Sequence, residues 1–306
     1  MCSRTCRFAL VSDGVYSLQC VYVDAQITRP LTKGQTTDPD AALVGVTSVD
    51  DELFVLLRQK QAGGFWANLF NVRTYRNIVV VYSIIVYQTL RHFKLSAVGS
   101  AHLGDITSCV RHKCLYTSDT DNSCIHRYDL ASSTENKWPV SGRPYGLSVT
   151  PSCNLLVACQ GEAKLVELSA DSGQCVREIA LESDIVNPWH GVQLTNGQFV
   201  VSHGRSDSLH RVCVVGDDGK VTCSYGGLCK CEVGQLNVPC HVAVDKDSQF
   251  IFAADHSNQR VVLLSPTLQF VRYIRLIEGP RRLYLHQATR RLFVGHFGDD
   301  VTVIHL

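Results

Sequence analysis

Residues 237–276, "NVPCHVAVDKDSQFIFAADHSNQRVVLLSPTLQFVRYIRL", contain four short apolar segments separated by turns that are polar or contain proline. Segments of about four to eight residues, rich in β-branched and aromatic side chains and bounded by turn residues, are typical of β-strands. The same order of segments occurs in "GRPYGLSVTPSCNLLVACQGEAKLVELSADSGQCVREIAL", residues 142–181. The stretch is therefore one copy of a four-stranded repeat.

Further copies of this repeat begin at Ala42, Gly104, Asn187 and Gly279. The copies recur about every 40–50 residues, which is the spacing of four-stranded β-propeller blades. No stretch has the period of an amphipathic helix, so folds that mix helices with a sheet are disfavoured. We therefore expect an all-β protein, a six-bladed β-propeller that spans residues 42–306.

The last copy has only three strands and stops at Leu306. A blade without its outer strand leaves an unpaired edge. In the N-terminal segment, residues 1–41, the stretch "YSLQCVYVD" at 16–24 has a strand-like pattern but no blade of its own. We expect residues 16–24 to supply the missing outer strand and close the ring.

The first copy departs from the repeat because about residues 59–76 are inserted between its second and third strands. The insert carries Phe65, Trp66 and Phe70. An apolar loop at this position is either a binding element or an irregularity of the sequence, and both readings stay open.

The composition disfavours a general affinity for polyanions or membranes. The formal net charge is +1, from 29 basic and 28 acidic residues, so no overall field attracts nucleic acid or an anionic surface. The longest apolar run, "IVVVYSIIVY" at 78–87, is predicted as a buried strand, since a spanning helix needs about 20 residues. The N-terminus lacks the pattern of a signal peptide. We expect a cytoplasmic protein without membrane contact, whose 14 cysteines are mostly reduced.

One recurring set of polar residues points to a known family. Asp255 follows the second strand of its copy, and Asn258 and Arg260 lead into the third. This arrangement resembles the NHL repeat, and Asp119, Asn122 and Arg127 in the second copy are similar at longer spacing. The resemblance implies an NHL-type propeller like the C-terminal domain of tripartite-motif proteins, where such domains recruit substrates or RNA for ubiquitin ligases. The RING, B-box and coiled coil of those proteins do not occur in this sequence.

A carboxylate and a guanidinium at neighbouring strand ends can pair, and the carboxylate can also accept backbone N–H groups of the loop. A partly exposed pair of this kind contributes about 0.5–1 kcal/mol. We therefore interpret Arg260 as a structural staple of its blade, with direct contact to a ligand as the alternative.

The candidate binding site follows from the antiparallel pairing of the first two strands of each copy. If each hairpin is regular, His190 lies opposite His203, His241 opposite Asp255, and Arg282 opposite His296. These positions surround the mouth of the central channel. The predicted binding face comprises Tyr145, Trp189, His190, His203, His241, Asp255, Arg281, Arg282 and His296.

Two functions of different classes fit this face. The first is a non-enzymatic scaffold that binds a protein or peptide, or with less support RNA, in a ubiquitin-ligase context by resemblance. Protein interfaces favour aromatic and arginine anchors, and the best basic patch for RNA is Arg281, Arg282, Arg290 and Arg291. The alternative is a metal-dependent lyase or lactonase with His190, His203 and His241 as candidate ligands. No complete ligand set or acid–base pair is evident, so no cofactor and no catalytic residue is assigned.

Overall fold

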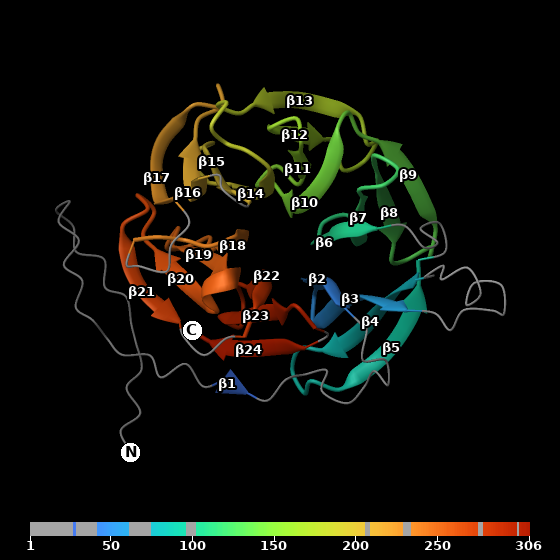
Figure 1. Cartoon of the computed structure of the whole chain (residues 1–306). Helices are drawn as coiled ribbons and strands as arrows, with labels where there is room; N and C mark the ends of the chain where they lie inside the picture. The colour runs from blue at the N-terminus through green and yellow to red at the C-terminus, as the bar shows by residue number, and fades with distance from the viewer. Residues whose placement is uncertain are drawn as a thin grey trace, which may run out of the picture.

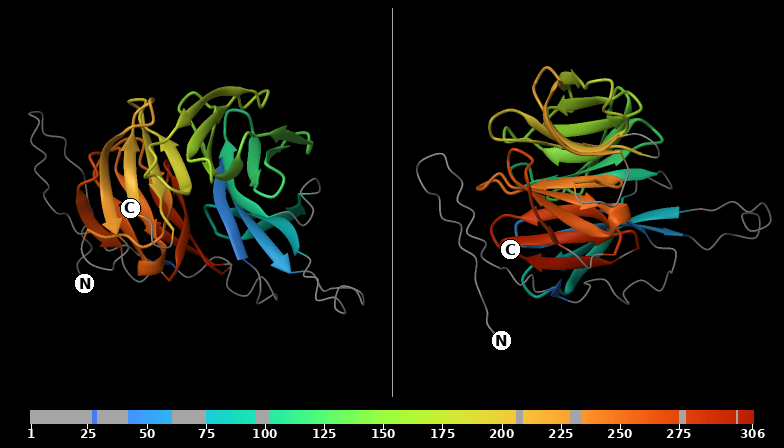
Figure 2. Two further views of the ribbon diagram at one scale, coloured as in Figure 1. Left: turned by 45° about the horizontal axis from the view of Figure 1, so that its top comes forward. Right: turned by 60° about the vertical axis from the view of Figure 1, so that its left-hand side comes forward.

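The computed structural model describes residues 27–28, 42–60, 75–95, 102–205, 209–228, 234–274, 278–298 and 300–306. Six antiparallel sheets of four strands each are arranged in a ring around a central axis (Figure 1). Side views show the sheets stacked around this axis (Figure 2). The prediction of an all-β, six-bladed propeller is therefore confirmed. Within the described residues no helix is long and apolar enough to cross a membrane.

The blades follow one another along the chain. Blade 1 comprises β2 (Ala42–Val49), β3 (Glu52–Lys60), β4 (Tyr75–Ser83) and β5 (Thr89–Lys94). Blade 2 comprises β6 (Leu103–Cys109), β7 (Cys114–Asp119), β8 (Cys124–Asp129) and β9 (Glu135–Pro139). Blade 3 comprises β10 (Arg143–Val149), β11 (Leu155–Gln160), β12 (Lys164–Leu168) and β13 (Cys175–Ala180).

The second half of the ring repeats this plan. Blade 4 comprises β14 (Pro188–Gln193), β15 (Phe199–His203), β16 (Leu209–Val215) and β17 (Val221–Leu228). Blade 5 comprises β18 (Pro239–Val244), β19 (Ile251–Asp255), the short 3₁₀ helix η1 (His256–Asn258), β20 (Arg260–Leu264) and β21 (Phe270–Ile274). Blade 6 comprises β22 (Pro280–His286), β23 (Arg291–His296) and β24 (Val301–His305), and its sheet also contains β1 (Ile27–Thr28).

The outer edge of blade 6 pairs with a segment from the N-terminal region. β1 lies antiparallel to β24, with Ile27 opposite Ile304 and Thr28 opposite Val303. The predicted closing strand, residues 16–24, lies outside the described residues. Closure of the ring by residues 16–24 therefore stays a prediction.

Apolar side chains fill the space between each pair of neighbouring blades. Blade 6 meets blade 1 in the same way, because Leu43 and Leu53 of blade 1 pack in one cluster with Phe293 and Val303 of blade 6. Corresponding clusters lie between the other neighbours. The first and last blades are therefore joined by a hydrophobic interface.

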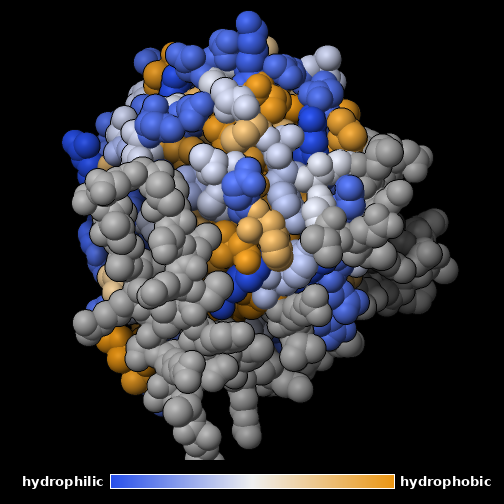
Figure 3. Space-filling view, turned by 90° about the vertical axis from the view of Figure 1, so that its left-hand side faces the viewer, coloured by the Kyte–Doolittle hydropathy of each residue, from blue (hydrophilic) through white to orange (hydrophobic). Residues whose placement is uncertain are grey.

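The outer surface of the ring is mixed in character. On the side that carries β17 and β21, hydrophilic residues surround a smaller hydrophobic area (Figure 3). Phe270 of β21 is 40% exposed and stacks on Tyr225 of β17 with ring centroids 6.4 Å apart. Blades 4 and 5 therefore also meet through aromatic contact at their outer strands.

Blade 1 differs from the sequence prediction at one end of its third strand. The apolar run 78–87 is not one buried strand, because β4 ends at Ser83 and a turn follows. Ser83 Oγ accepts hydrogen bonds from the backbone N–H groups of Ile85 and Val86, whose side chains are exposed. A serine that caps a turn thus outweighs the β propensity of the residues after it. Of the predicted insert, residues 61–74 lie outside the described part of the chain.

The polar residues at the strand ends form buried staples. Arg260 Nε donates to Asp255 Oδ2 at 2.7 Å, and Asn258 Nδ2 donates to the same oxygen at 2.9 Å. Asp255 Oδ1 accepts the backbone N–H of Asn237 at 2.7 Å, and the Asp255 side chain is buried. The pair is therefore buried rather than partly exposed, which makes the loss of either partner more costly than the sequence suggested.

The second staple uses a different partner for its aspartate from the one predicted. In blade 2, Asp119 accepts hydrogen bonds from Asn122, but its ring partner is His126, whose Nε2 lies 3.0 Å from Asp119 Oδ2. Arg127 instead donates to Asp129 at 3.3 Å. The side chains of adjacent residues in a strand point to opposite faces, so only one of His126 and Arg127 can face Asp119.

Substituting Asp255 by alanine should lower the free energy of unfolding by about 3–5 kcal/mol, because it leaves the Arg260 guanidinium buried without its partner. Urea unfolding followed by tryptophan fluorescence measures this loss. As a matched control, Lys113→Ala removes the exposed Lys113–Asp50 pair and should cost less than about 1 kcal/mol. Equal losses in the two variants would show that the staple is not a main support of blade 5.

Candidate functional site

The inner strand of each blade carries an irregularity that places the candidate residues. In blade 4, Pro188 pairs with His203 and His190 with Ser202, so Trp189 is an extra residue. A bulge of this kind shifts the register by one residue on one strand. The predicted pairing of His190 with His203 is therefore wrong.

The other hairpins of the predicted face show the same difference. Pro239 rather than His241 faces Asp255, and Pro280 rather than Arg282 faces His296. The bulges separate the inner-strand residues from their expected partners. The nine predicted side chains consequently divide into an inner group, a mouth group and a group at the strand ends.

The inner group consists of His190, His241 and Arg282. Together with Asp105, which was not predicted for the binding face, these residues form a buried polar cluster at the centre of the ring, the axial cluster. Asp105 is its common acceptor. Its Oδ1 accepts the backbone N–H of Ile106 at 2.9 Å and lies 3.4 Å from Arg282 Nε. Its Oδ2 accepts the backbone N–H of Leu147 at 3.0 Å and the ring N–H of His241 at 3.3 Å. One carboxylate therefore links blades 2, 3, 5 and 6.

Arg282 binds the remaining side of the ring. Its side chain is only 2% exposed. Its Nε donates to the carbonyl oxygen of Val44 in blade 1 at 2.7 Å, and its Nη2 donates to the carbonyl oxygen of Gly104 in blade 2. The same Nη2 lies 3.5 Å from the Tyr145 hydroxyl of blade 3. Arg282 is thus a buried structural contact rather than an exposed binding residue.

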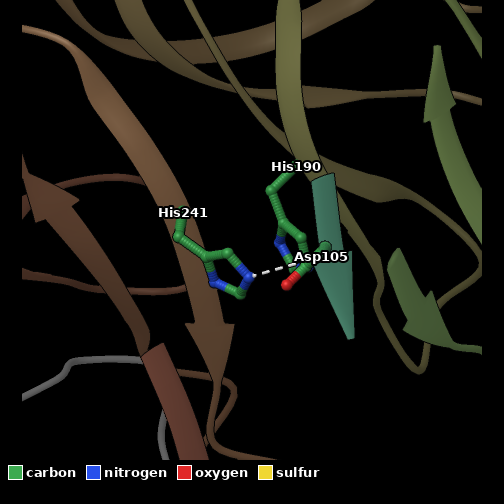
Figure 4. Close-up of side chains that lie close together, drawn as sticks. All are labelled: Asp105, His190 and His241. Carbon is green, nitrogen blue, oxygen red and sulfur yellow. Dashed lines mark hydrogen bonds and ion pairs between the residues drawn. The ribbon is translucent and has the colours of Figure 1, made fainter. Parts of the chain in front are cut away.

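The two histidines of the axial cluster stack on each other. Their ring centroids are 3.6 Å apart with an angle of 23° between the planes, and both rings lie beside Asp105 (Figure 4). His190 Nε2 donates to the carbonyl oxygen of Leu147 at 3.0 Å. Within the described part of the chain, neither Nδ1 has a hydrogen-bond partner.

Burial decides the charge of these side chains. It lowers the pKa of His190 to about 3 and also lowers the pKa of His241, so both rings are neutral at pH 7. Burial alone would raise the pKa of Asp105, but His241 and the Arg282 charge outweigh burial and hold this pKa at about 2. The cluster therefore holds one carboxylate, one guanidinium and two neutral rings, with no net charge.

Three of these groups could in principle hold a metal ion. One ligand atom each from Asp105, His190 and His241 lies within 4.8 Å of the others. However, both Asp105 oxygens already accept backbone N–H groups, and Arg282 lies against the same carboxylate. Charges of +2 and +1 about 5 Å apart repel by roughly 7 kcal/mol at an effective dielectric constant of about 20. The set therefore fits a metal ion poorly while Arg282 is in place.

A second group with ligand-type atoms is the blade 2 staple, where Asp119, Cys124 and His126 lie within the same 4.8 Å limit. Asp119 already accepts hydrogen bonds from Asn122 and His126. Burial raises the pKa of the Cys124 thiol to about 11, so the thiol is protonated at pH 7 when no metal is bound. These residues have a structural explanation and require no ion.

The mouth of the channel carries a second group, the mouth cluster, which consists of Tyr145, Trp189, His256, Arg281 and Phe297. Tyr145 and Trp189 meet edge to face with ring centroids 5.1 Å apart. Arg281 reaches from blade 6 across the ring to blade 3, where its Nη2 lies 3.4 Å from the Tyr145 hydroxyl. Its guanidinium also lies 5.6 Å from the centre of the Phe297 ring, which is 65% exposed.

Several arginines lie near the mouth. Partial burial and the charges of Arg58, Arg281 and Arg143 lower the pKa of His102, with Asp121 acting against them. Burial alone would raise the pKa of Tyr145, but Arg282 and Arg281 outweigh burial and lower it. No acidic side chain of the described chain forms an ion pair with Arg58, Arg143 or Arg281. The mouth thus offers unpaired positive charge beside aromatic rings.

The remaining predicted residues lie at strand ends. His203 accepts a hydrogen bond from Arg211 Nε at 3.3 Å, so it takes the staple position that Asp255 takes in blade 5. His296 lies 2.7 Å from the Thr302 hydroxyl within blade 6. His203 and Asp255 are thus buried staple residues, and His296 is half-buried at the edge of the mouth.

The predicted basic patch is divided between distant places. Arg282 is buried in the axial cluster and Arg281 lies at the mouth. Arg290 pairs with Asp245 at 2.7 Å, and Arg291 donates to the carbonyl oxygen of Ile84, both at the opposite end of the β22–β23 hairpin. These four arginines form no continuous surface.

The predicted binding face left out Asp105, His256, Phe297 and Arg58. His256 and Phe297 each directly follow the last residue of a second strand, Asp255 and His296. This shared position could have predicted that both residues lie at the mouth, since residues just after the second strand of a blade lie on that face. Arg58 lies near the end of the second strand of blade 1, just before the predicted insert, so the same position pointed to it, but no sequence pattern indicated that it affects the pKa of His102.

No family model matches the chain, and no curated protein matches its sequence. Solved structures share its fold. Hydrazine synthase from Kuenenia stuttgartiensis superposes with a TM-score of 0.60 at 14% identity, over 89% of this chain and 97% of that one. An inactive variant of virginiamycin B lyase from Staphylococcus aureus, with quinupristin, gives 0.59 at 9% identity over 89% and 97%. The Cps50 (Swd1) propeller domain from Myceliophteria thermophila gives 0.55 at 12% identity over 86% and 82%. At these identities the likeness establishes the fold alone, and the NHL resemblance gains no support.

Replacing Arg282 by methionine should lower the free energy of unfolding by about 3–5 kcal/mol, because Asp105 then stays buried without its cation. The neighbouring Arg281→Ala variant, which removes a half-exposed side chain, should cost less than about 1 kcal/mol. Urea unfolding of both variants measures the difference. If Arg282→Met is as stable as Arg281→Ala, the axial cluster does not hold the ring together.

Acid should destabilise the fold through the neutral buried histidines. Between the unfolded pKa of about 6.5 and folded values of about 3 for His190 and about 4 for His203, only the unfolded chain takes up these protons. Stability should therefore fall as pH drops from 6.5 to 4.5, by up to about 1.4 kcal/mol per pH unit for each such histidine.

The test is urea unfolding at several pH values for the wild type and for His190→Gln. Glutamine can still donate to the Leu147 carbonyl oxygen but does not titrate, so the variant should lose part of the slope. The exposed His92→Gln variant should keep it. An unchanged slope in His190→Gln would mean that His190 is protonated in the folded state.

Proposed function

We propose that this protein is a non-enzymatic scaffold that binds an acidic peptide segment of a partner protein at the channel mouth. The observation that carries the proposal is the mouth cluster, in which Arg281 lies unpaired between the rings of Tyr145 and Phe297. Aromatic side chains and arginine are the residues that dominate the binding energy of protein interfaces.

The charge of the mouth sets the chemistry of the partner. Arg58, Arg143 and Arg281 have no carboxylate partner among the described residues and lie close enough to lower the pKa of His102. An arginine binds a carboxylate through two parallel hydrogen bonds, which lysine cannot do. Glutamate or aspartate side chains therefore suit the arginines, and an apolar or aromatic neighbour suits exposed Phe297.

RNA fits this surface less well than an acidic peptide. A protein that contacts about 6–10 phosphates needs a matching number of basic groups along the path of the strand. The net charge is +1, and the arginines of the last blade are divided between the centre, the mouth and the opposite end. A few arginines around one ring can bind a short acidic segment more readily than a continuous phosphate backbone.

A metal-dependent enzyme is the second candidate function. In its favour, Asp105, His190 and His241 offer ligand atoms within 4.8 Å of one another, and a lyase is among the proteins of similar fold. Against it, Arg282 already neutralises Asp105, and all four side chains of the axial cluster are buried. Metal analysis of the purified protein decides: one equivalent of zinc or manganese, lost in His241→Ala, would favour the enzyme.

The resemblance of Asp255, Asn258 and Arg260 to an NHL repeat would place such a scaffold in substrate recognition for a ubiquitin ligase. This role remains part of the proposal and depends on the identity of the partner. It is tested by asking whether a protein that carries the preferred acidic segment is ubiquitinated less in cells that lack this chain.

A displayed library of random short peptides should yield acidic sequences with an aromatic or apolar residue. Binding of a synthetic peptide from this set should weaken about 30-fold in Arg281→Ala, since truncating a central anchor typically costs about 2 kcal/mol. Fluorescence anisotropy measures the affinity. Arg290→Ala, whose guanidinium pairs with Asp245 on the opposite face, should bind as the wild type does.

Two results would contradict the proposal. One is a library selection that shows no preference for acidic residues. The other is equal binding by Arg281→Ala and the wild type. Tighter binding of single-stranded oligouridylate than of any acidic peptide at physiological salt would instead favour RNA as the partner.

A further inference from the structure

The face opposite to the mouth brings two cysteines, a histidine and an aspartate together. Cys109 ends β6 and His112 lies in the turn that follows. Cys153 lies in the turn before β11, and Asp171 lies in the turn after β12. The connections between first and second strands and between third and fourth strands share one face of a propeller, so residues from blades 2 and 3 meet here.

The contacts among these side chains determine that a proton can pass from the Cys109 thiol to His112. Cys109 Sγ lies 3.2 Å from His112 Nδ1, and His112 Nε2 lies 3.2 Å from Asp171 Oδ1. A carboxylate can only accept, so His112 Nε2 carries the hydrogen and its Nδ1 presents a lone pair to the thiol. This is the arrangement in which an imidazole removes a proton from a nucleophile while a carboxylate holds the ring.

Burial limits what the Cys109 thiol can attack. Cys109 is 2% exposed, and burial raises its pKa, with the adjacent Cys153 thiol adding to the increase. A bulky substrate therefore cannot reach Cys109 from solvent. Cys153 is half-buried and packs against the same apolar cluster between blades 2 and 3. The sulfur of the adjacent Cys153 lies within reach of Cys109 and becomes an electrophile once it is oxidised.

We propose that Cys109 and Cys153 form a disulfide when a hydroperoxide oxidises Cys153, with His112 as the proton acceptor for Cys109. The Cys153 thiol loses its proton and its sulfur attacks hydrogen peroxide: a sulfur–oxygen bond forms, the oxygen–oxygen bond breaks, and the departing hydroxide takes up the thiol proton and leaves as water, which gives the sulfenic acid. His112 Nδ1 then takes the Cys109 proton. The Cys109 thiolate attacks the Cys153 sulfur: a sulfur–sulfur bond forms, the sulfur–oxygen bond of the sulfenic acid breaks, and the departing hydroxide takes the proton from His112 and leaves as a second water. Two thiols and one peroxide give one disulfide and two waters.

Cys114 is the competing partner for Cys109, because the two residues are directly opposite in the β6–β7 hairpin. Cys114 Sγ, however, is directed at the carbonyl oxygen of His112 at 3.0 Å, and burial raises the pKa of its thiol to about 11. Cys114 therefore neither reacts readily with peroxide nor faces the lone pair of His112. The proposed bond instead links blade 2 to blade 3 across their interface.

The test treats the reduced, purified full chain with hydrogen peroxide, blocks free thiols and maps disulfides by mass spectrometry without reduction. The expected product is a Cys109–Cys153 disulfide, together with a higher midpoint of thermal unfolding, since the bond joins two blades. The exposed Cys175→Ser variant should give the same product. A main product that joins Cys109 to Cys114, or no bond between Cys109 and Cys153, would overturn the proposal.

The role of His112 has a separate test in the rate of disulfide formation. His112→Asn should slow this rate about 100-fold, which is within the range for a positioned base, and the Cys153 sulfenic acid should then accumulate and be trapped by dimedone. Asp171→Asn, at a side chain that is 81% exposed, should slow the rate less and leave the thermal unfolding of the reduced protein unchanged. Equal rates in His112→Asn and the wild type would exclude His112 as the base.

Discussion

The ion pair between Asp105 and Arg282 is the interaction on which the rest of the ring depends. Its two partners are on the inner strands of blades 2 and 6, and through backbone groups they also bind blades 1 and 3. Two neutral histidines from blades 4 and 5 complete the group. Each of the two buried charges requires the other as its partner. A blade that left the ring would therefore leave one of these charges unpaired in an apolar environment. The hydrophobic interfaces between blades bury most of the apolar surface, and the axial cluster fixes the position of the blades relative to one another.

Because side chains fill the centre of the ring, a partner can bind only at the ends of the strands. The loops at the mouth are free to differ between blades because the staples below them are already satisfied: Asp255 with Arg260, Asp119 with His126, and His203 with Arg211. The side chains at the mouth are consequently ones that the fold does not require for its stability. Arg281 and Phe297 have this character, whereas Arg282, the direct neighbour of Arg281, belongs wholly to the interior.

The sequence predicted the six blades because each buried strand has to present apolar residues at a fixed spacing, and such a pattern is local. It predicted the Asp255–Arg260 neighbourhood for the same reason, since five residues separate the two. The site was harder to predict. An extra residue in the inner strand, such as Trp189, has no compositional signature, so the facing pairs were displaced. The pairing of Asp105 with Arg282 and the contact of His112 with Asp171 join different blades, and single-sequence patterns do not record contacts over such distances in the chain.

The place of Arg282 in the chain has a consequence for how the protein is made. Its hydrogen bond to Gly104 spans 178 residues, so a chain that leaves the ribosome from its N-terminus presents Asp105 long before its cation exists. Blades 1 to 5 can form local hairpins during synthesis, but their inner edges must wait in water for the last strands. Synthesis of the last blade, rather than the formation of any earlier blade, is therefore the event after which the ring can assemble.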